Sequence, residues 1–392
     1  MADKVGFSRV AEWIRSDDEI KIIVLSAGGK TARLKKVTDV LIDAGNRILS
    51  GEPVNKSLAQ FTDRVISDAK AIGLDSLIKD ELMKIEQEVE KDFSLDFILS
   101  RGEYFYAKLF SLYYGLPFID SASLIGFYDD GSLNLGLCEY RIKKCYERVG
   151  RFVTGGFYGA YSNGKIKTFT RGGSDFSGAI MARGINATEY LNFTDVDGIY
   201  PLDPKIKKSM PIDEISFDTV RLLGEYGAGV LHPASVLPLY GTNTGIRLRN
   251  TFNNRAIGTL IKEFTTKKPF AVAFKTGCYY IKAVNRGKGY FLLDLFEKSG
   301  IKIICVSSSL DFFECCFEGD IKVDTRLLGG ADFIQVEEAL VMYFSPCDKS
   351  KDVIKAITES FNVFFSVEFC YGAYVVIPKT QLIDVEKFLC KN

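Results

Sequence analysis

The apolar residues near the start of the chain form two different patterns. Residues 5–16 carry apolar side chains at helical spacing, which predicts a short amphipathic helix. Residues 20–25 form an almost continuous apolar run, as expected of a parallel strand buried on both faces. The run leads into SAGGK at residues 26–30, a glycine loop with a hydroxyl and an ammonium group. One such loop is a weak indicator of a phosphate site.

The same order of strand, glycine-rich loop and helix returns further along the chain. Residues 151–154 predict a strand that enters the loop GGFYG at 155–159, and a hairpin turning at 162–164 follows. The loop RGGSD at 171–175 then precedes a helix that we expect to begin near Ser174. Paired glycines let a backbone approach an anion, and the helix N-terminus adds the positive end of a dipole.

A second polar loop, TDVDG at residues 194–198, closes the strand after this helix. Open parallel sheets usually place nucleotide contacts at such strand ends. The repeated units therefore favour a nucleotide-handling α/β domain. We interpret the two loops, 171–175 and 194–198, as a phosphoryl-transfer site divided between them.

The remaining segments of this domain are mostly helical. Residues 56–92 predict a helical cover with little chemistry, and residues 117–135 predict short strands around a turn at 129–131. Ser100-Arg101-Gly102-Glu103 places a glycine in helical sequence, where it costs roughly 1 kcal/mol relative to alanine. Two explanations of this glycine remain open. Another segment approaches the helix backbone closely there, or the glycine marks a simple junction between helices.

The domain ends in a helix over residues 215–231, followed by His232 and a strand at 246–249. His232 precedes a proline at the start of a further predicted helix, which favours a packing or capping role over catalysis.

From residue 265 onward the pattern changes. Strands are predicted at 272–274, 279–284 and 301–306, with an amphipathic helix before the third. Further strands and two helices follow between residues 338 and 389. The order strand–helix–strand–strand–helix thus occurs twice, which suggests paired α+β ligand-binding modules and a symmetric interface.

The composition excludes several classes of function for this protein. The chain has 50 Lys+Arg against 50 Asp+Glu, so no net charge would steer it toward nucleic acid or an anionic membrane. It has no apolar run of transmembrane length and no apolar signal core at its N-terminus. The nine scattered cysteines, without a CxxC pair, predict reduced thiols in a cytoplasmic protein. The single histidine excludes most histidine-based metal or acid–base schemes.

Taken together, these motifs resemble those of the aspartate kinases of the amino-acid kinase superfamily, over nearly the whole chain. The order and spacing match as well as the motifs themselves, whereas the resemblance of the tail to paired ACT modules is weaker. The matching motifs are SAGGK (26–30), SRGE (100–103), GGFYG (155–159), RGGSD (171–175), TDVDGIYPLDP (194–204), GAGVLHP (227–233) and RNT (249–251).

The resemblance implies an α/β amino-acid kinase fold in residues 1–262, a mostly parallel sheet between helical layers. It implies tandem ACT-like, ferredoxin-like modules in residues 265–392. The implied reaction transfers the γ-phosphoryl group of ATP, with Mg²⁺, to the side-chain carboxylate of L-aspartate. A carboxylate is already ionised at neutral pH, so no general base is required. An effector such as lysine or threonine and a homodimer through the ACT region are also implied.

Residue roles follow from the matched motifs. Arg171 would pair with the α-carboxylate of aspartate and Glu103 would hold its α-ammonium. The remaining implied roles are aspartate-pocket lining for Ala27, Thr38 and Phe157, catalysis beside Arg171 for Ser174 and Asp175, and nucleotide binding for Ser26, Thr194, Asp195, Tyr200 and Lys205. Asp203 and Pro204 are read as turn formers. No metal ligand is assigned.

The sequence departs from the family pattern in three places. Aspartate kinases begin with a strand and a Lys-Phe-Gly-Gly loop, and Met1 here aligns just after that segment. We interpret this as a truncated or wrongly assigned start. Gly229 stands where many relatives carry lysine, and the second tail module matches poorly. The alternatives are a catalytically impaired amino-acid-binding paralogue or another amino-acid kinase.

Overall fold

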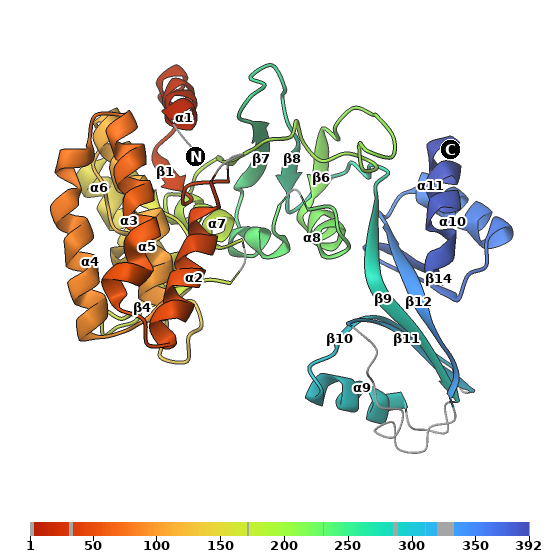
Figure 1. Ribbon diagram of the computed structural model, residues 1–392. Coiled ribbons are helices and arrows are strands. Elements are labelled where there is room, and N and C mark those ends of the chain that lie inside the picture. Colours follow the sequence, from red (N-terminus) through yellow and green to blue (C-terminus); the bar gives the residue numbers. More distant parts are fainter. Residues whose placement is uncertain are drawn as a thin grey trace. The chain divides into compact units, whose positions relative to one another are not determined.

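The computed structural model describes residues 4–30, 34–170, 172–229, 231–284, 289–309, 311–319 and 333–391. The chain forms two compact units, drawn in Figure 1. Unit 1 consists of Met1–Asp195 and Ala234–Ala256, and unit 2 of Val196–Pro233 and Ile257–Asn392. The domain limits expected from the sequence, 1–262 and 265–392, stay a prediction.

Unit 1 combines a group of helices with short strands. Its helices are α1 (Lys4–Ser16), α2 (Val37–Leu49), α3 (Val54–Ala71), α4 (Lys79–Lys91), α5 (Leu95–Tyr114), α6 (Leu135–Val149) and α7 (Gly173–Gly184), with 3-10 turns at Asp75–Leu77 and Ser121–Ser123. Its strands are β1 (Ile22–Leu25), β2 (Phe152–Gly155), β3 (Tyr158–Ala160), β4 (Ile166–Thr168), β5 (Glu189–Thr194) and β7 (Gly245–Asn250). The predicted helix at 5–16, strand at 20–25 and hairpin after residue 158 are confirmed.

Parallel pairing brings the predicted loops together. Strands β1 and β2 run parallel, from Ile22 opposite Phe152 to Leu25 opposite Gly155. The two loops that follow therefore start side by side, and the Gly156 N–H donates to the Leu25 carbonyl at 2.9 Å. Strands β5 and β7 are likewise parallel, so their carboxyl ends also share an edge.

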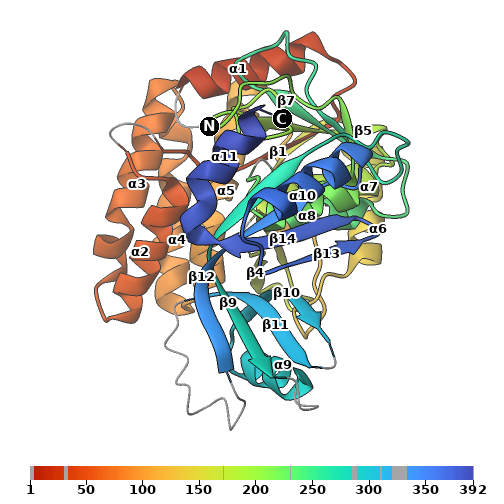
Figure 2. The same ribbon diagram turned by 90° about the vertical axis from the view of Figure 1, so that its right-hand side faces the viewer.

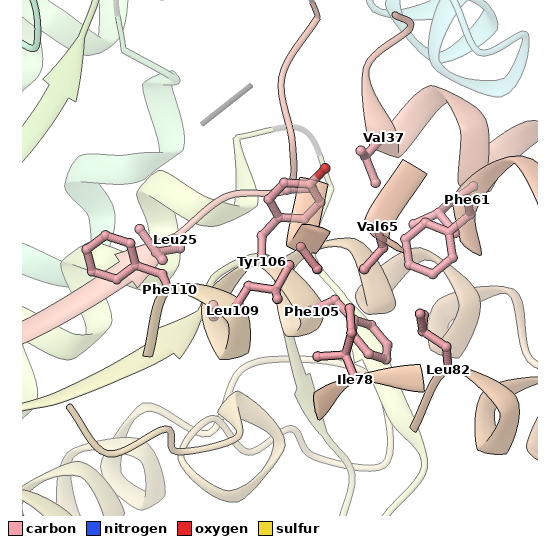
Figure 3. Packing of buried hydrophobic residues seen from close by; sticks show 14 of the residues in the cluster. Leu25, Val37, Phe61, Val65, Ile78, Leu82, Phe105, Tyr106, Leu109 and Phe110 are labelled. Carbon is pink, nitrogen blue, oxygen red and sulfur yellow. The ribbon is translucent and has the colours of Figure 1, made fainter. Parts of the chain in front are cut away.

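The core of unit 1 lies between α2, α3, α4 and α5 and the inner side of β1. Figure 3 shows this packing: Phe61 and Val65 of α3, Leu82 of α4 and Phe105 of α5 meet in one cluster. A second cluster joins α6 and α7 to the opposite side of the β1–β2 pair. The strands that carry the loops are therefore held from both faces.

Helix α5 runs without interruption through Gly102. Ser94 caps its start by accepting the Phe97 N–H at 3.2 Å, and Gly115 ends it in a left-handed conformation. The helix-junction reading of residues 100–103 is therefore wrong, and the close-approach reading is confirmed by the site geometry below.

Two sequence predictions for unit 1 need correction. Residues 56–92 are not wholly helical, because the chain leaves α3 after Ala71 and turns at Gly73 before α4. Residues 117–135 contain isolated bridges, such as Phe127 with Leu133, rather than the predicted strands. The backbone pairs only at single residues around the turn. An alternating apolar pattern is expected both for such single bridges and for a continuous strand ladder, so the sequence could not tell them apart.

Unit 2 is dominated by one antiparallel sheet of six strands in the order β10-β11-β9-β12-β14-β13. Figures 1 and 2 show two long central strands crossing it, with helices near both ends. The sheet strands are β9 (Val272–Val284), β10 (Lys302–Ser308), β11 (Phe312–Glu318), β12 (Phe333–Phe344), β13 (Phe365–Phe369) and β14 (Gly372–Pro378). The other elements are β6 (Glu214–Ser216), α8 (Phe217–Glu225), β8 (Leu260–Lys262), α9 (Gly289–Lys298), α10 (Asp348–Ser360) and α11 (Leu382–Lys391), with a 3-10 turn at Lys379–Gln381. A further 3-10 turn, Pro233–Leu239, belongs to unit 1 except for its first residue.

The sheet of unit 2 has a separate core at each end. Phe296 of α9 packs with Phe313 and Phe317 of β11 at one end. Ile357 of α10 and Val385 of α11 pack on β12 and β14 at the other. A C-terminal antiparallel sheet region thus follows the α/β part of the chain.

Three predictions for unit 2 are corrected. Residues 272–274 and 279–284 belong to one strand, β9, whose pairing with β12 shifts register opposite Leu340. A bulge at Gly277, with φ +71°, explains the apparent break in the apolar pattern. Strand β11 went unrecognised. The helix predicted over 215–231 ends at Glu225, where a glycine-containing segment follows.

None of the described helices has both the length and the apolarity needed to cross a lipid bilayer.

Candidate active site

The loop after β1 is tied to the middle of α5. The Ala27 N–H donates to Oε1 of Glu103 at 3.2 Å, and Glu103 is only 4% exposed. Gly102 makes this approach possible, because a Cβ at that position would lie 2.9 Å from the Cβ of Ala27. The glycine in helical sequence therefore serves a close contact between α5 and the loop.

Glu103 is electrostatically unusual. Its Oε2 is buried and has no hydrogen-bond partner among the described residues. Burial raises the pKa of this carboxyl group to about 7, although the hydrogen bond from Ala27 acts in the opposite direction. A buried carboxylate with one unsatisfied oxygen is suited to receive a cationic group.

The loop after β2 packs against the N-terminus of α7. A Cβ on Gly156 would lie 2.8 Å from both the Cα and the Cβ of Ser174. A Cβ on Gly155 would lie 3.1 Å from the backbone carbonyl of Glu103. The structure thus brings Ala27, Glu103 and Ser174 to one edge of the β1–β2 pair.

Phe157 continues this loop in a left-handed conformation with φ 76°, which is uncommon for a residue with a large side chain. Its N–H donates to the Ser177 hydroxyl at 3.0 Å, and that hydroxyl donates to the Gly173 carbonyl at 2.8 Å. Ser177 was not predicted as a site residue, and a serine within the helix gives little signal of this role. Phe157 itself is half-buried.

The first turn of α7 also carries Asp175. Its Oδ1 accepts from the Asn192 amide at 3.0 Å, and the same amide donates to the Tyr190 hydroxyl at 2.9 Å. Asn192 is a buried polar residue in β5, and it was not predicted as a site residue because its partner Asp175 comes from another segment. Arg171, predicted for both catalysis and substrate binding, lies outside the described residues.

The predicted nucleotide residues of unit 1 lie where β5 ends. The Thr194 carbonyl accepts from both the N–H and the hydroxyl of Thr251, at 2.9 and 3.0 Å. The side-chain amide of Asn250 contacts the Asp195 carbonyl at 3.5 Å. Asp195 is exposed, so its carboxylate is open to solvent.

Two further predicted residues lie around the β1 loop. Ser26 is exposed in that loop, and Thr38 is half-buried in the first turn of α2.

Tyr200 and Lys205 belong to unit 2. Tyr200 is half-buried, and burial together with the nearby charge of Asp197 raises the pKa of its hydroxyl. Lys205 is exposed, and its N–H donates to the Asp203 side chain at 2.8 Å. This hydrogen bond is the one that an aspartate side chain makes at a turn.

The described residues contain no cluster of three or more His, Cys, Asp or Glu side chains that could hold a metal ion. All nine cysteines are free thiols. The described part of unit 1 thus offers backbone N–H groups, a helix N-terminus and the buried carboxylate of Glu103.

Known proteins share both the sequence pattern and the fold. A family model described as the amino acid kinase family matches residues 1–250. Aspartokinase 3 of Bacillus subtilis is 29% identical over 339 residues, which covers 79% of this chain and 74% of that protein. The chain spans 57% of the length of another relative, the chloroplastic aspartokinase 1 of Arabidopsis thaliana.

Solved structures agree with these relatives. The aspartate kinase of Clostridium acetobutylicum matches with a TM-score of 0.89 and 25% identity, covering 100% of this chain and 97% of that one. Aspartokinase III of Escherichia coli, solved with aspartate and ADP, matches in fold with a TM-score of 0.77 and 20% identity, covering 98% and 95%. The chain therefore belongs to the amino acid kinase family, and the members that it is similar to are aspartate kinases.

Proposed function

We propose that this chain transfers the γ-phosphoryl group of ATP to the side-chain carboxylate of L-aspartate, giving 4-phospho-L-aspartate and ADP. The observation that carries the proposal is the buried Glu103 carboxylate, which accepts from Ala27 and has its second oxygen unpartnered among the described residues. The Escherichia coli relative solved with aspartate and ADP supports the choice of substrates.

Glu103 would hold the α-ammonium group of aspartate. An ammonium ion brought against the buried carboxylate supplies the missing partner and lowers the carboxyl pKa from its raised value. Ala27, Thr38 and Phe157 would line the same pocket. Arg171 would pair with the α-carboxylate through its planar guanidinium group.

The reacting carboxylate of aspartate needs no general base, because it is ionised at neutral pH. What the protein must supply is alignment and neutralisation of charge on the transferred group. The N-terminus of α7, beside Gly156, offers backbone N–H groups and the positive end of a helix dipole. Ser174 and Asp175 lie in this turn and would stand between aspartate and the phosphates.

Mg²⁺ would accompany the nucleotide. It prefers oxygen ligands and commonly keeps several waters, with one or two carboxylates and the substrate phosphates completing its shell. Because the described residues contain no cluster of three or more His, Cys, Asp or Glu side chains, phosphates and waters would supply most of the ligands. When bound, the ion would neutralise phosphate charge. Ser26, Thr194, Asp195, Tyr200 and Lys205 are the proposed nucleotide-binding residues.

The finer features implied by the family resemblance belong to the same proposal. The catalytic part would be a mostly parallel sheet between helical layers, and residues 265–392 would form tandem ACT-like modules. These modules would bind an effector such as lysine or threonine and form a homodimer. In the first module, residues 284–290 would form the effector loop beside the serine run Ser307–Ser309. The loop lies largely outside the described residues, whereas the serines lie at the end of β10 and just after it. A cytoplasmic location stays a prediction.

The test is an ADP-release assay of the purified chain with ATP, Mg²⁺ and one acceptor at a time. L-Aspartate should drive ADP release, and hydroxylamine should trap the acyl phosphate as a hydroxamate. L-Glutamate, carbamate and UMP serve as the competing acceptors. Release driven by one of them, without release by aspartate, would refute the proposal. Amino-acid binding to the full chain by calorimetry, with no turnover, would favour a regulatory paralogue.

A further inference from the structure

The loop after β1 narrows to a neck where Gly28 and Gly29 face Lys35 and Val37. Arg64 closes this neck from α3, a helix that the sequence predicted only as a cover. The Val37 N–H donates to the Gly28 carbonyl at 2.9 Å, so the two sides of the loop meet there. Arg64 of α3 donates from Nη1 to the Lys35 carbonyl at 3.3 Å and from Nη2 to the Gly29 carbonyl at 3.5 Å. One guanidinium group therefore joins both sides of the neck.

Arg64 is held in place by two side chains. Its Nε donates to Oδ2 of Asp68 at 2.7 Å, and the Tyr106 hydroxyl of α5 donates to the same oxygen. Burial, reinforced by the Asp68 charge, raises the pKa of Tyr106 far above its ordinary value, so this hydroxyl remains a donor. The side chains of Arg64 and Asp68 are only 7% and 16% exposed.

The ring of Tyr106 also forms the floor beneath the loop. A Cβ on Gly28 would overlap the phenol ring, so only glycine allows the loop to lie on it. Figure 3 shows Tyr106 in the core cluster with its hydroxyl at the edge, on the side of Val37. The loop is thus supported from below by α5 and joined across its neck by α3.

Removing the Asp68 carboxylate takes the charged partner from the buried guanidinium group, and removing Arg64 takes a donor from the Gly29 and Lys35 carbonyls. A buried guanidinium group must find acceptors, and here two of them are the carbonyls of Gly29 and Lys35. The planar fork of arginine reaches three acceptors at fixed angles, which a single ammonium group cannot do. Ala27 lies just before the neck and Thr38 just after it.

We propose that Arg64, oriented by Asp68 and Tyr106, is a positioning residue for aspartate binding. It fixes the distance between the two sides of the loop, and so between Ala27 and Thr38. This inference rests on the proposed function for its substrate, because these two residues are the ones proposed to line the aspartate pocket. The closure of the neck itself depends only on the contacts described above.

The test compares Arg64→Lys with the wild-type chain in two measurements. Hydrogen exchange should show that the Val37 amide loses protection, because the neck opens when the guanidinium bridge is gone. Steady-state kinetics should show KM for aspartate rising roughly tenfold or more, since small misplacements of binding groups are costly. KM for ATP should change less than about twofold. Arg47→Lys is the matched control, because Arg47 of α2 forms a pair with Glu52 near the surface. This variant should change neither readout.

Tyr106→Phe is a second, milder variant, because it keeps the ring beneath Gly28 and removes only the donor to Asp68. It should shift KM for aspartate in the same direction by a smaller factor. Retained Val37 protection in Arg64→Lys would overturn the inference, and so would lost protection with an unchanged KM for aspartate. Both of those results leave the proposed function intact. A wild-type chain that neither binds nor phosphorylates aspartate refutes the proposed function, and with it the substrate part of this inference.

Discussion

The proposed aspartate side of unit 1, around Glu103, and the proposed nucleotide side, at the end of β5, are built in opposite ways. Around Glu103 the contacts are buried and tight, and Gly102 and Gly156 leave no room for a single added carbon. At the end of β5, Asp195 is exposed and Thr194 half-buried, with hydrogen bonds made largely through backbone carbonyls. A small amino acid must be selected by fixed groups, whereas phosphates can be held by backbone dipoles and solvent-exposed side chains.

The largest effect should come from adding a side chain where the packing around Glu103 leaves no room. Gly156→Val would force β2 and α7 apart, because its Cβ would lie 2.8 Å from the Cα of Ser174. We expect kcat/KM for aspartate to fall at least about a hundredfold. The free energy of unfolding should fall by about 1–3 kcal/mol.

Gly136→Ala is the control for this change, because its Cβ would meet no atom within 4 Å. Kinetics and urea unfolding of both variants make the comparison. An active Gly156→Val variant would show that the tight packing is dispensable.

The next effect should come from Glu103→Gln. The amide oxygen can still accept from Ala27, but the charge that would hold the substrate ammonium is gone. We expect KM for aspartate to rise about a hundredfold, with KM for ATP nearly unchanged. Isothermal titration of aspartate and ATP would separate the two. An equal loss of affinity for both ligands would contradict the division of the site into two sides.

The raised pKa of Glu103 predicts that the free energy of unfolding depends on pH. Its carboxyl pKa is about 7 in the folded chain against 4.5 for the ordinary group, so the folded state binds the proton more tightly. The stabilisation is complete below pH 4.5 and is lost as pH rises through about 7.

Glu103→Gln should therefore gain roughly 2–3 kcal/mol relative to wild type between these limits. Urea unfolding of both proteins from pH 5 to pH 8 measures the difference. A difference that does not change with pH would rule out a raised pKa. Aspartate binding should also weaken as pH falls below about 7, because the ammonium needs the ionised carboxylate.

A smaller effect is expected where the two sides meet. Asn192→Ala removes the amide that donates to Asp175 and to the Tyr190 hydroxyl. Loss of these buried hydrogen bonds should cost about 1–3 kcal/mol of stability and lower kcat several-fold. Thermal unfolding and initial rates at saturating substrates test this. A change in KM for aspartate alone would mean that Asp175 belongs to the aspartate side.

The smallest effect should come from the open side. Asp195→Asn alters one exposed carboxylate, so the free energy of unfolding should stay within about 0.5 kcal/mol of wild type. KM for ATP should change a few-fold and KM for aspartate hardly at all. A loss of aspartate affinity as large as that of Glu103→Gln would remove the contrast between the two sides.

The site could be predicted from the sequence to an uneven degree. Glycine loops after apolar strands are local signals, so the loops at 26–30 and 155–159 and the helix beginning near Ser174 were predictable. The roles of Ser177 and Asn192 were not, because each depends on a partner brought by another segment. Residues 56–92 show the limit most clearly: their helical pattern predicted a cover, yet Arg64 closes the loop neck.

Periodicity and motif order are local properties, so the sequence alone predicted several helices and strands, the loops that carry the site, and the resemblance to aspartate kinases. The three-dimensional packing was needed to show that α5 passes unbroken beneath the loop after β1 and that the apolar break near residue 277 is a bulge. Glu103 meets Ala27 across 76 positions of chain, and its raised pKa arises from burial by the whole of that packing. Such contacts depend on how distant segments pack together, so no local pattern in the sequence encodes them.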